Sequence, residues 1–277
     1  KPDPGTDGFA HTLRDIASSS GMMLVRVEKP GLGDSEGPDC RDGALEEEMA
    51  AYRATLRELR AMPDVDTARI YLLGGSLGGA LAPVLAAEDP RGIAGVISAG
   101  GFTKTWLEHM LEIERRRLDL LGQSPSQVNE AMRGFAPFYT EYLVGRRTPA
   151  QVLADHPQLK PLWYDEPAHQ YGRPAAYYHA VQQLDVEGAW WAIAERGIPA
   201  LVVWGEYDWI MSRDDQERAV SIVNRRRAGA GTLVILSKTD HGLMVYPSLA
   251  DAFGDGRPTY DGAAARAIIG WLRRGAR

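Results

Sequence analysis

The chain has 277 residues, enough for one large domain or for a domain that carries an insertion. Hydrophobic residues make up 44% of it and charged residues 25%, which is the composition of an ordinary globular protein. Its net charge of -6 argues against binding to nucleic acid, whose phosphates require a concentration of positive charge.

The cysteine count and the hydropathy pattern bear on disulfides, zinc sites and cellular location. Cys40 is the only cysteine, so the chain has no internal disulfide and no cysteine-based zinc site. No apolar run approaches the roughly 20 residues of a membrane-spanning helix, and no secretory signal opens the chain. These features predict a cytoplasmic protein without a membrane partner. Since the chain begins with Lys1 rather than methionine, we expect that an upstream segment has been removed or left out.

The first hundred residues alternate between predicted helices and predicted strands. The elements are a helix at 9–20, a strand at 22–27, a helix at 44–61, a strand at 70–73, a helix at 77–88 and a strand at 92–98. This order predicts an α/β fold with a mostly parallel sheet that is covered by helices on both faces.

Helical periodicity dominates the middle of the chain, and the sheet pattern then returns. Helices are predicted at 106–118, 128–143, 149–153 and 177–193, followed by a strand at 199–204, a helix at 213–224, a strand at 231–236 and a helix at 263–274. We therefore divide the chain into a first part of the core at 1–101, an inserted helical cap at 102–197 and a second part of the core at 198–277.

A G-x-S-x-G motif around Ser76 lies where the strand at 70–73 runs into an Ala/Leu-rich helix. This context predicts a nucleophile elbow, in which the serine occupies a sharp turn. Glycines on either side, Gly74, Gly75 and Gly78, let the two backbones approach closely. The hydroxyl of Ser76 would project at the positive end of the following helix.

A second G-x-S-x-G match surrounds Ser35, between Pro30 and Pro38. No helical pattern starts directly after it, so the match lacks the strand and helix that the motif requires. We interpret Ser35 as a loop residue.

Three side chains with complementary chemistry each follow a predicted strand: Ser76, Asp208 and His241. The carboxyl ends of parallel strands meet at one edge of a sheet, where open α/β sheets place their sites. A serine hydroxyl becomes a good nucleophile when a histidine takes its proton, and an aspartate holds that histidine in the required tautomer. The sequence therefore predicts a Ser-His-Asp triad, although Asp208 alone would also suit a turn or a helix cap.

The elbow and the chain order Ser, Asp, His resemble the α/β-hydrolase superfamily. The resemblance covers the chain apart from the predicted cap, and Gly74-Gly75-Ser76 is also similar to the elbow of proline iminopeptidase-like members. It implies Asp208 as the acid, since Gly-x-x-Asp after the strand is the placement in that superfamily. It implies no metal and no organic cofactor.

The chain contains other acids and histidines of the same chemical types. Glu206, Asp214 and Asp215 are neighbouring acids that the resemblance does not favour. The remaining histidines fall in the opening segment or in the predicted cap, where we expect surface or packing roles: His11, His109, His156, His169 and His179.

The resemblance also implies an oxyanion hole, with the backbone N–H of Leu77 as one donor. The second donor should come from a loop after a strand that has no counterpart here, between the strands at 22–27 and 70–73. A gap in the middle of a sheet would leave buried backbone groups unpaired. We therefore expect a missing N-terminal segment or a second chain to complete the sheet. Direct pairing of these two strands would contradict this expectation.

The leading hypothesis is a serine hydrolase that cleaves the ester, thioester or amide of a small acyl substrate through an acyl-enzyme on Ser76. Two alternatives stay open: an acyltransferase or thioesterase of a biosynthetic pathway, and a non-catalytic ligand-binding protein on the same fold. The sequence also leaves a homo-oligomer open.

Overall fold

The structure, a computed structural model, describes residues 7–33, 35–37, 39–163, 165–166 and 168–275. Lys1 lies outside these residues. The chain forms two compact units: Lys1–Val25, Asp64–Thr103 and Asp185–Arg277 make the first, and Arg26–Pro63 and Lys104–Leu184 make the second.

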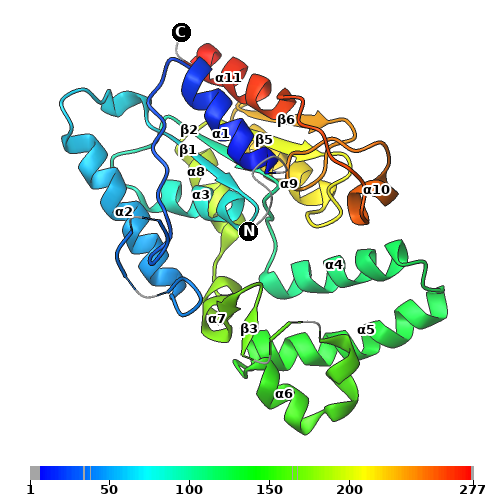
Figure 1. The fold of residues 1–277 in the computed structure, drawn as a ribbon. Coiled ribbons are helices and arrows are strands. Elements are labelled where there is room, and N and C mark those ends of the chain that lie inside the picture. The colour runs from blue at the N-terminus through cyan, green and yellow to red at the C-terminus, as the bar shows by residue number, and fades with distance from the viewer. Residues whose placement is uncertain (1–6, 34, 38, 164, 167, 276–277) are drawn as a thin grey trace. The chain divides into compact units, whose positions relative to one another are not determined.

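The first unit is built on a parallel sheet of four strands (Figure 1). In spatial order these are β1 (Tyr71–Gly75), β2 (Gly95–Ala99), β5 (Ala200–Gly205) and β6 (Gly231–Leu236). All three pairings are parallel. Every residue of β2 and β5 is buried, as the central strands of a sheet covered on both faces require. The predicted α/β fold is confirmed.

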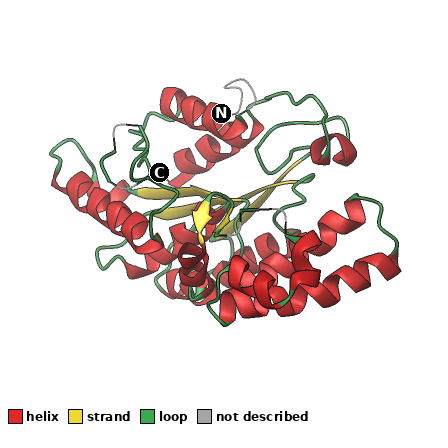
Figure 2. Cartoon of the chain, turned by 60° about the horizontal axis from the view of Figure 1, so that its bottom comes forward, coloured by secondary structure: helices red, strands yellow, loops and turns green. Residues whose placement is uncertain are grey.

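Helices cover both faces of this sheet. Helices α1 (Gly8–Ser19) and α11 (Ala263–Gly275) lie on one face, and α3 (Leu77–Glu88), α8 (Val186–Glu195) and α9 (Arg213–Arg226) lie on the other (Figure 1). Figure 2 shows the strands between layers of helices.

The core beneath α1 and α11 joins elements that are far apart in the sequence. Ile16 of α1 and Ile268 of α11 belong to the same buried cluster as Ile97 of β2 and Leu201 of β5. Burying one such side chain contributes roughly 1.5–3 kcal/mol, so this cluster is a main source of stability for the sheet that positions the site.

The second unit is mostly helical. Its elements are α2 (Leu45–Ala61), α4 (Trp106–Leu120), α5 (Pro125–Tyr139), the π-helical turn η3 (Thr140–Val144), α6 (Pro149–Asp155), the 3-10 helix η4 (Pro157–Leu162), the short strands β3 (His169–Gln170) and β4 (Arg173–Pro174), and α7 (Ala175–Gln182). Thr105, Ser124 and Thr148 begin α4, α5 and α6 as capping boxes. No helix in the described chain is both long and apolar enough to cross a membrane. That residues 102–197 form a helical cap stays a prediction.

The predicted helix at 177–193 is two helices, α7 and α8. The side chain of Asp185 accepts a hydrogen bond from the N–H of Gly188 at 2.8 Å, which starts a new helix at Val186. Helix α8, although it lies within the predicted insertion, packs against α3 and α9 in the first unit.

The predicted strand at 22–27 is wrong, because the described residues include no strand there. Its side chains do alternate: Met22 and Leu24 pack against the core, whereas Met23 is 57% and Val25 43% exposed. Alternation alone does not make a strand, which also needs a hydrogen-bonded neighbour. Within the described part of the chain β1 pairs with β2 and not with this segment. The segment or chain expected to fill this place stays a prediction.

In a protein that consists of residues 1–277 alone, without the additional segment or chain expected beside β1, we expect the amides of β1 to exchange with deuterated solvent faster than those of β5. Of the strands described, one borders β1 and two border β5, so β1 has fewer backbone groups held by neighbours. Hydrogen–deuterium exchange of peptides from the two strands measures the difference. Equal protection would contradict an open edge at β1.

Candidate active site

Ser76 lies on a strained turn between β1 and α3. Its backbone has φ 55° and ψ -128°, a region that costs a residue with a side chain about 1–3 kcal/mol. The N–H of Ser76 donates to the carbonyl oxygen of Ala99 at 2.9 Å, which ties the turn to the end of β2. The local geometry is therefore that of a strand–turn–helix elbow with the serine at its apex.

The glycines around Ser76 have different roles. A Cβ at residue 74 would lie 1.9 Å from the carbonyl oxygen of Gly78, so the strand and the helix approach closely only because residue 74 is glycine. A Cβ at residue 75 would lie 2.5 Å from the ring of Phe9. A Cβ at residue 78 would meet nothing within 4 Å, so Gly78 contributes its backbone to the contact rather than its own lack of a side chain.

Leu77 is the first residue of α3. The first N–H groups of a helix have no intrahelical acceptor, and they carry the positive end of the helix dipole. The N–H of Leu77 is therefore suited to an anionic oxygen beside Ser76. The second donor of the predicted oxyanion hole stays a prediction, with the segment that should carry it.

Asp208 follows β5 and His241 follows β6 in the first unit. The Oδ2 of Asp208 lies 2.8 Å from the Nδ1 of His241. The side chain of Asp208 is 1% exposed and that of His241 is 18% exposed. Asp208 also fits the alternative interpretation as a turn residue, since its Oδ1 accepts hydrogen bonds from the N–H groups of Ile210 at 3.0 Å and Met211 at 2.8 Å. These two bonds fix the carboxylate so that its other oxygen meets the imidazole.

Gly100 lies against the His241–Asp208 pair. A Cβ at this residue would lie 3.0 Å from the Oδ2 of Asp208 and 3.2 Å from the Nδ1 of His241, and its φ is +60°. The N–H of Gly100 donates to the carbonyl oxygen of Val203 at 3.0 Å. The preceding residue, Ala99, accepts the hydrogen bond from Ser76, so two consecutive residues connect the elbow with the imidazole.

The charges around His241 change its pKa. Burial would lower that pKa, but the carboxylates of Asp208 and Asp240 outweigh burial and raise it above its ordinary value. The pKa of Asp240 is itself raised, mainly by burial. Since the folded protein favours the charged imidazole, this group adds to stability below its ordinary pKa of 6.5, and the contribution is lost as pH rises through the higher folded value.

The other acids near the strand ends have different partners. Glu206 accepts hydrogen bonds from the Ser237 hydroxyl and the Lys238 N–H, both at 2.9 Å, and so holds the turn that precedes His241. Asp214 is exposed in the first turn of α9. Asp215 is buried and binds Thr103.

The remaining histidines have local partners. His11 stacks on Tyr260, His109 contacts the ring of Trp106, His156 pairs with Glu141, His169 lies near Glu166, and the Nε2 of His179 lies 3.0 Å from the carbonyl oxygen of Arg147. Ser35 lies in a loop, where its N–H donates to the carbonyl oxygen of Leu32 at 3.0 Å. Within the described residues, no three His, Cys, Asp or Glu side chains are grouped as metal ligands would be.

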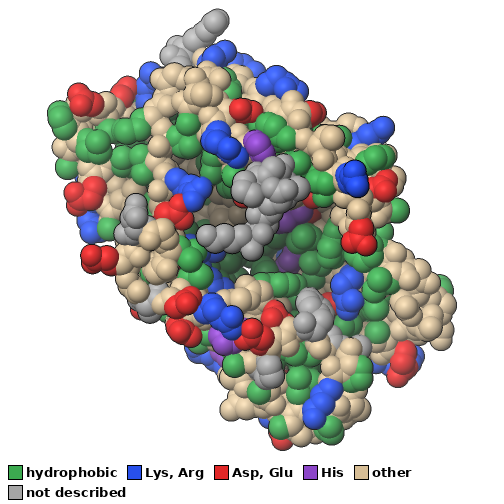
Figure 3. All heavy atoms as spheres, viewed as in Figure 1, with side chains coloured by type: hydrophobic (Ala, Val, Ile, Leu, Met, Phe, Trp, Pro, Cys, Tyr) green, Lys and Arg blue, Asp and Glu red, His purple; other side chains and the backbone are tan. Residues whose placement is uncertain are grey.

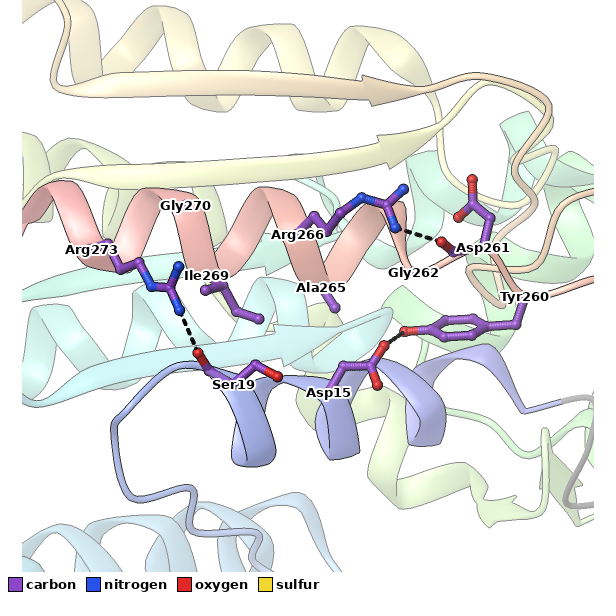
Figure 4. A pocket seen from close by; sticks show the side chains of 10 residues that line it. All are labelled: Asp15, Ser19, Tyr260, Asp261, Gly262, Ala265, Arg266, Ile269, Gly270 and Arg273. Carbon is purple, nitrogen blue, oxygen red and sulfur yellow. Dashed lines mark hydrogen bonds between the residues drawn. The ribbon is translucent and has the colours of Figure 1, made fainter.

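The first unit also has a cavity of about 470 Å³ between α1 and α11 (Figure 4). Its polar groups are satisfied locally: the Tyr260 hydroxyl donates to Asp15 at 2.6 Å, and Arg273 donates to the carbonyl oxygen of Ser19 at 2.7 Å. Neither Ser76 nor His241 lines it. This cavity is separate from the candidate active site.

Figure 3 shows Lys and Arg side chains interspersed with Asp and Glu side chains on one face of the molecule. Among the described residues visible on that face, Lys and Arg side chains do not gather into a broad basic patch of the kind that binds nucleic-acid phosphates.

Comparisons with known proteins indicate the family and the fold of this chain. The model of the family described as serine aminopeptidase, S33, matches residues 7–245. The chain is 37% identical over 105 residues to the alpha/beta hydrolase domain-containing protein WAV2 of Arabidopsis thaliana, a match that spans 34% of this chain and 33% of that relative. It thus spans about a third of the curated relative's length.

Solved structures resemble the chain over nearly its whole length. The monoacylglycerol lipase of Paleococcus ferrophilus has a TM-score of 0.55 at 18% identity, with 97% of this chain and 90% of that one covered. Est1E of Butyrivibrio proteoclasticus with bound ferulic acid has a TM-score of 0.57 at 16% identity, with 97% and 83% covered. At these identities the likeness shows the fold.

We expect Asp208→Asn to lower the pKa of His241. The substitution removes the nearest negative charge while the imidazole remains buried, so burial has the larger effect. An NMR titration of the His241 ring in both proteins measures the shift, with His11 as an internal control. An unchanged His241 pKa would contradict the hydrogen bond between these two side chains.

We expect Gly100→Ala to displace the imidazole. The added methyl group would sit too close to both members of the pair, and alanine at this positive φ adds about 1–2 kcal/mol of strain. The downfield resonance of the Nδ1 proton of His241 should weaken or shift, and thermal unfolding should begin at lower temperature. Gly122→Ala, also at positive φ but with open space around it, is the matched control for backbone strain.

Proposed function

This chain belongs to the serine aminopeptidase S33 family of α/β-hydrolases, and we propose that it is a serine hydrolase that forms an acyl-enzyme on Ser76. The observation that carries the proposal is the hydrogen bond between His241 and Asp208. Gly100 lies against this pair, and the preceding residue, Ala99, accepts a hydrogen bond from the N–H of Ser76. The substrate would be a small molecule with an ester, thioester or amide bond.

In the proposed reaction, His241 takes the proton of the Ser76 hydroxyl while its oxygen attacks the carbonyl carbon of the substrate. The carbonyl oxygen becomes negative and accepts a hydrogen bond from the N–H of Leu77 at the start of α3. His241 then gives its proton to the leaving alcohol, thiol or amine. Water repeats these steps on the acyl-enzyme and releases the acid.

Asp208 supports this reaction through its two oxygens. The backbone donors of residues 210 and 211 hold Oδ1, so Oδ2 keeps the Nδ1 of His241 protonated and leaves Nε2 free to act as the base. The same carboxylate stabilises the imidazolium that forms during the reaction. Because the pKa of His241 is raised, the neutral base becomes available at a higher pH than for an ordinary histidine.

The choice between ester and amide substrates calls for a direct comparison. The description of the family names an aminopeptidase. Cleavage of an ester and cleavage of an amide both proceed through the same acyl-enzyme. A screen of p-nitrophenyl esters of graded acyl length against aminoacyl amides compares them by kcat/KM. Transfer of the acyl group to an added alcohol or thiol in the same assay would indicate the acyltransferase alternative.

We expect a fluorophosphonate probe to label the protein at Ser76, and the label to disappear in Ser76→Ala. Hydrolysis should fall by about 10³-fold or more in this variant, because the oxyanion donor and substrate binding alone retain only a small part of the catalysis. Ser35→Ala is the matched control, since it alters the other G-x-S-x-G serine and should label as the unmodified protein does. A folded protein that does not label would favour the ligand-binding alternative.

A further inference from the structure

The carboxylate of Asp215 is buried in the first unit although its position in the helix does not require this. It is 2% exposed in the first turn of α9, where Asp214 already provides an exposed negative charge for the helix dipole. Burying a carboxylate is costly unless hydrogen bonds replace its water. The partners of Asp215 therefore indicate what the burial accomplishes.

Those partners include a residue 112 positions away in the sequence. The Oδ1 of Asp215 accepts hydrogen bonds from the N–H of Thr103 at 2.8 Å and from its hydroxyl at 2.7 Å. The Oδ2 accepts one from the hydroxyl of Ser212 at 2.6 Å. One carboxylate thus connects the N-cap of α9 with the segment that follows β2.

The next residue of α9 holds the same segment. Gln216, which is 1% exposed, donates from Nε2 to the carbonyl oxygen of Gly101 at 2.7 Å and to that of Ser212 at 3.0 Å. Two adjacent side chains of α9 therefore bind Gly101 and Thr103. The chain leaves the first unit directly after Thr103.

The segment held in this way has little freedom on its other sides. A Cβ at residue 101 would lie 2.6 Å from the hydroxyl oxygen of Ser98 and 2.8 Å from the backbone of Gly79 in α3. Gly100 lies against the imidazole of His241 and the carboxylate of Asp208. A displacement of residues 100–103 would therefore reach both the elbow helix and the His241–Asp208 pair.

We propose that Asp215 is a positioning residue for His241, acting through Thr103 and Gly100. It holds the segment after β2 in the position in which Gly100 packs against the imidazole and keeps it beside Asp208. This inference rests on the proposed role of Ser76 and His241 in acyl transfer. Asp215 would be a third acid that supports the site, after Asp208 and Asp240, and it would act without contacting the substrate.

Thr103→Val and Thr103→Ser test the inference with little change in volume. Valine removes the hydroxyl that binds Asp215, and serine keeps it. We expect labelling of Ser76 by the fluorophosphonate to slow by about 10-fold to 10²-fold in Thr103→Val, the scale of a sub-ångström to 1 Å misplacement, and to recover in Thr103→Ser. The midpoint of the acid limb of labelling should move to lower pH in the valine variant, because His241 loses part of its interaction with Asp208.

Asp215→Asn should produce the same changes with larger size, and Asp214→Asn is its matched control on the exposed side of the same turn. Should Asp215→Asn fail to fold, the threonine pair decides the question. Variants that lower the melting temperature but label at the unmodified rate and with the unmodified pH midpoint would overturn the inference and leave the proposed function intact. A wild-type protein that does not label would overturn both.

Discussion

Ala99 and Gly100, at the carboxyl end of β2, hold the candidate site together through backbone contacts. Ala99 accepts the hydrogen bond that orients the turn of Ser76, and Gly100 donates to β5 at a place where a Cβ would lie against the imidazole. Backbone hydrogen bonds are short and directional, so the parallel sheet fixes the spacing of these parts more tightly than flexible side chains would. The sheet is buried on both faces in its central strands, which keeps this spacing constant.

Most of the fold could be predicted from the sequence because its signals are local, and the same signals place the three candidate site residues after strands. Apolar runs mark the strands, and Ser76, Asp208 and His241 each follow a strand by a few residues. The prediction of a strand at 22–27 is wrong because a strand also needs a hydrogen-bonded partner, and the alternation of its own side chains does not show whether such a partner is present. The start of α8 had a local signal in Asp185, which the apolar periodicity on either side concealed.

The hydrogen bonds and close contacts that surround the site give almost no signal in the sequence. In the sequence Asp215 is only one of several acids near Asp208, because distance along the chain from a strand does not tell which carboxylate is buried or what it binds. Gly100 and Gly101 do give a weak signal in the sequence. Two glycines at the end of a strand, at the edge of the sheet where sites lie, suggest that another part of the backbone approaches closely there. In the second unit, the buried pair of Arg173 and Glu48 at 2.7 Å likewise joins residues 125 positions apart and assigns α2 to that unit.

The conformation of Ser76 sets stability against reactivity at a single residue. Glycine adopts a positive φ without penalty, so glycine in place of this serine would relax the turn and leave its backbone contacts intact. The residue with the least backbone strain at the apex is thus glycine, which has no side chain that could react. Under the proposed function, selection for stability would favour glycine at this residue, whereas selection for a reactive hydroxyl would favour serine.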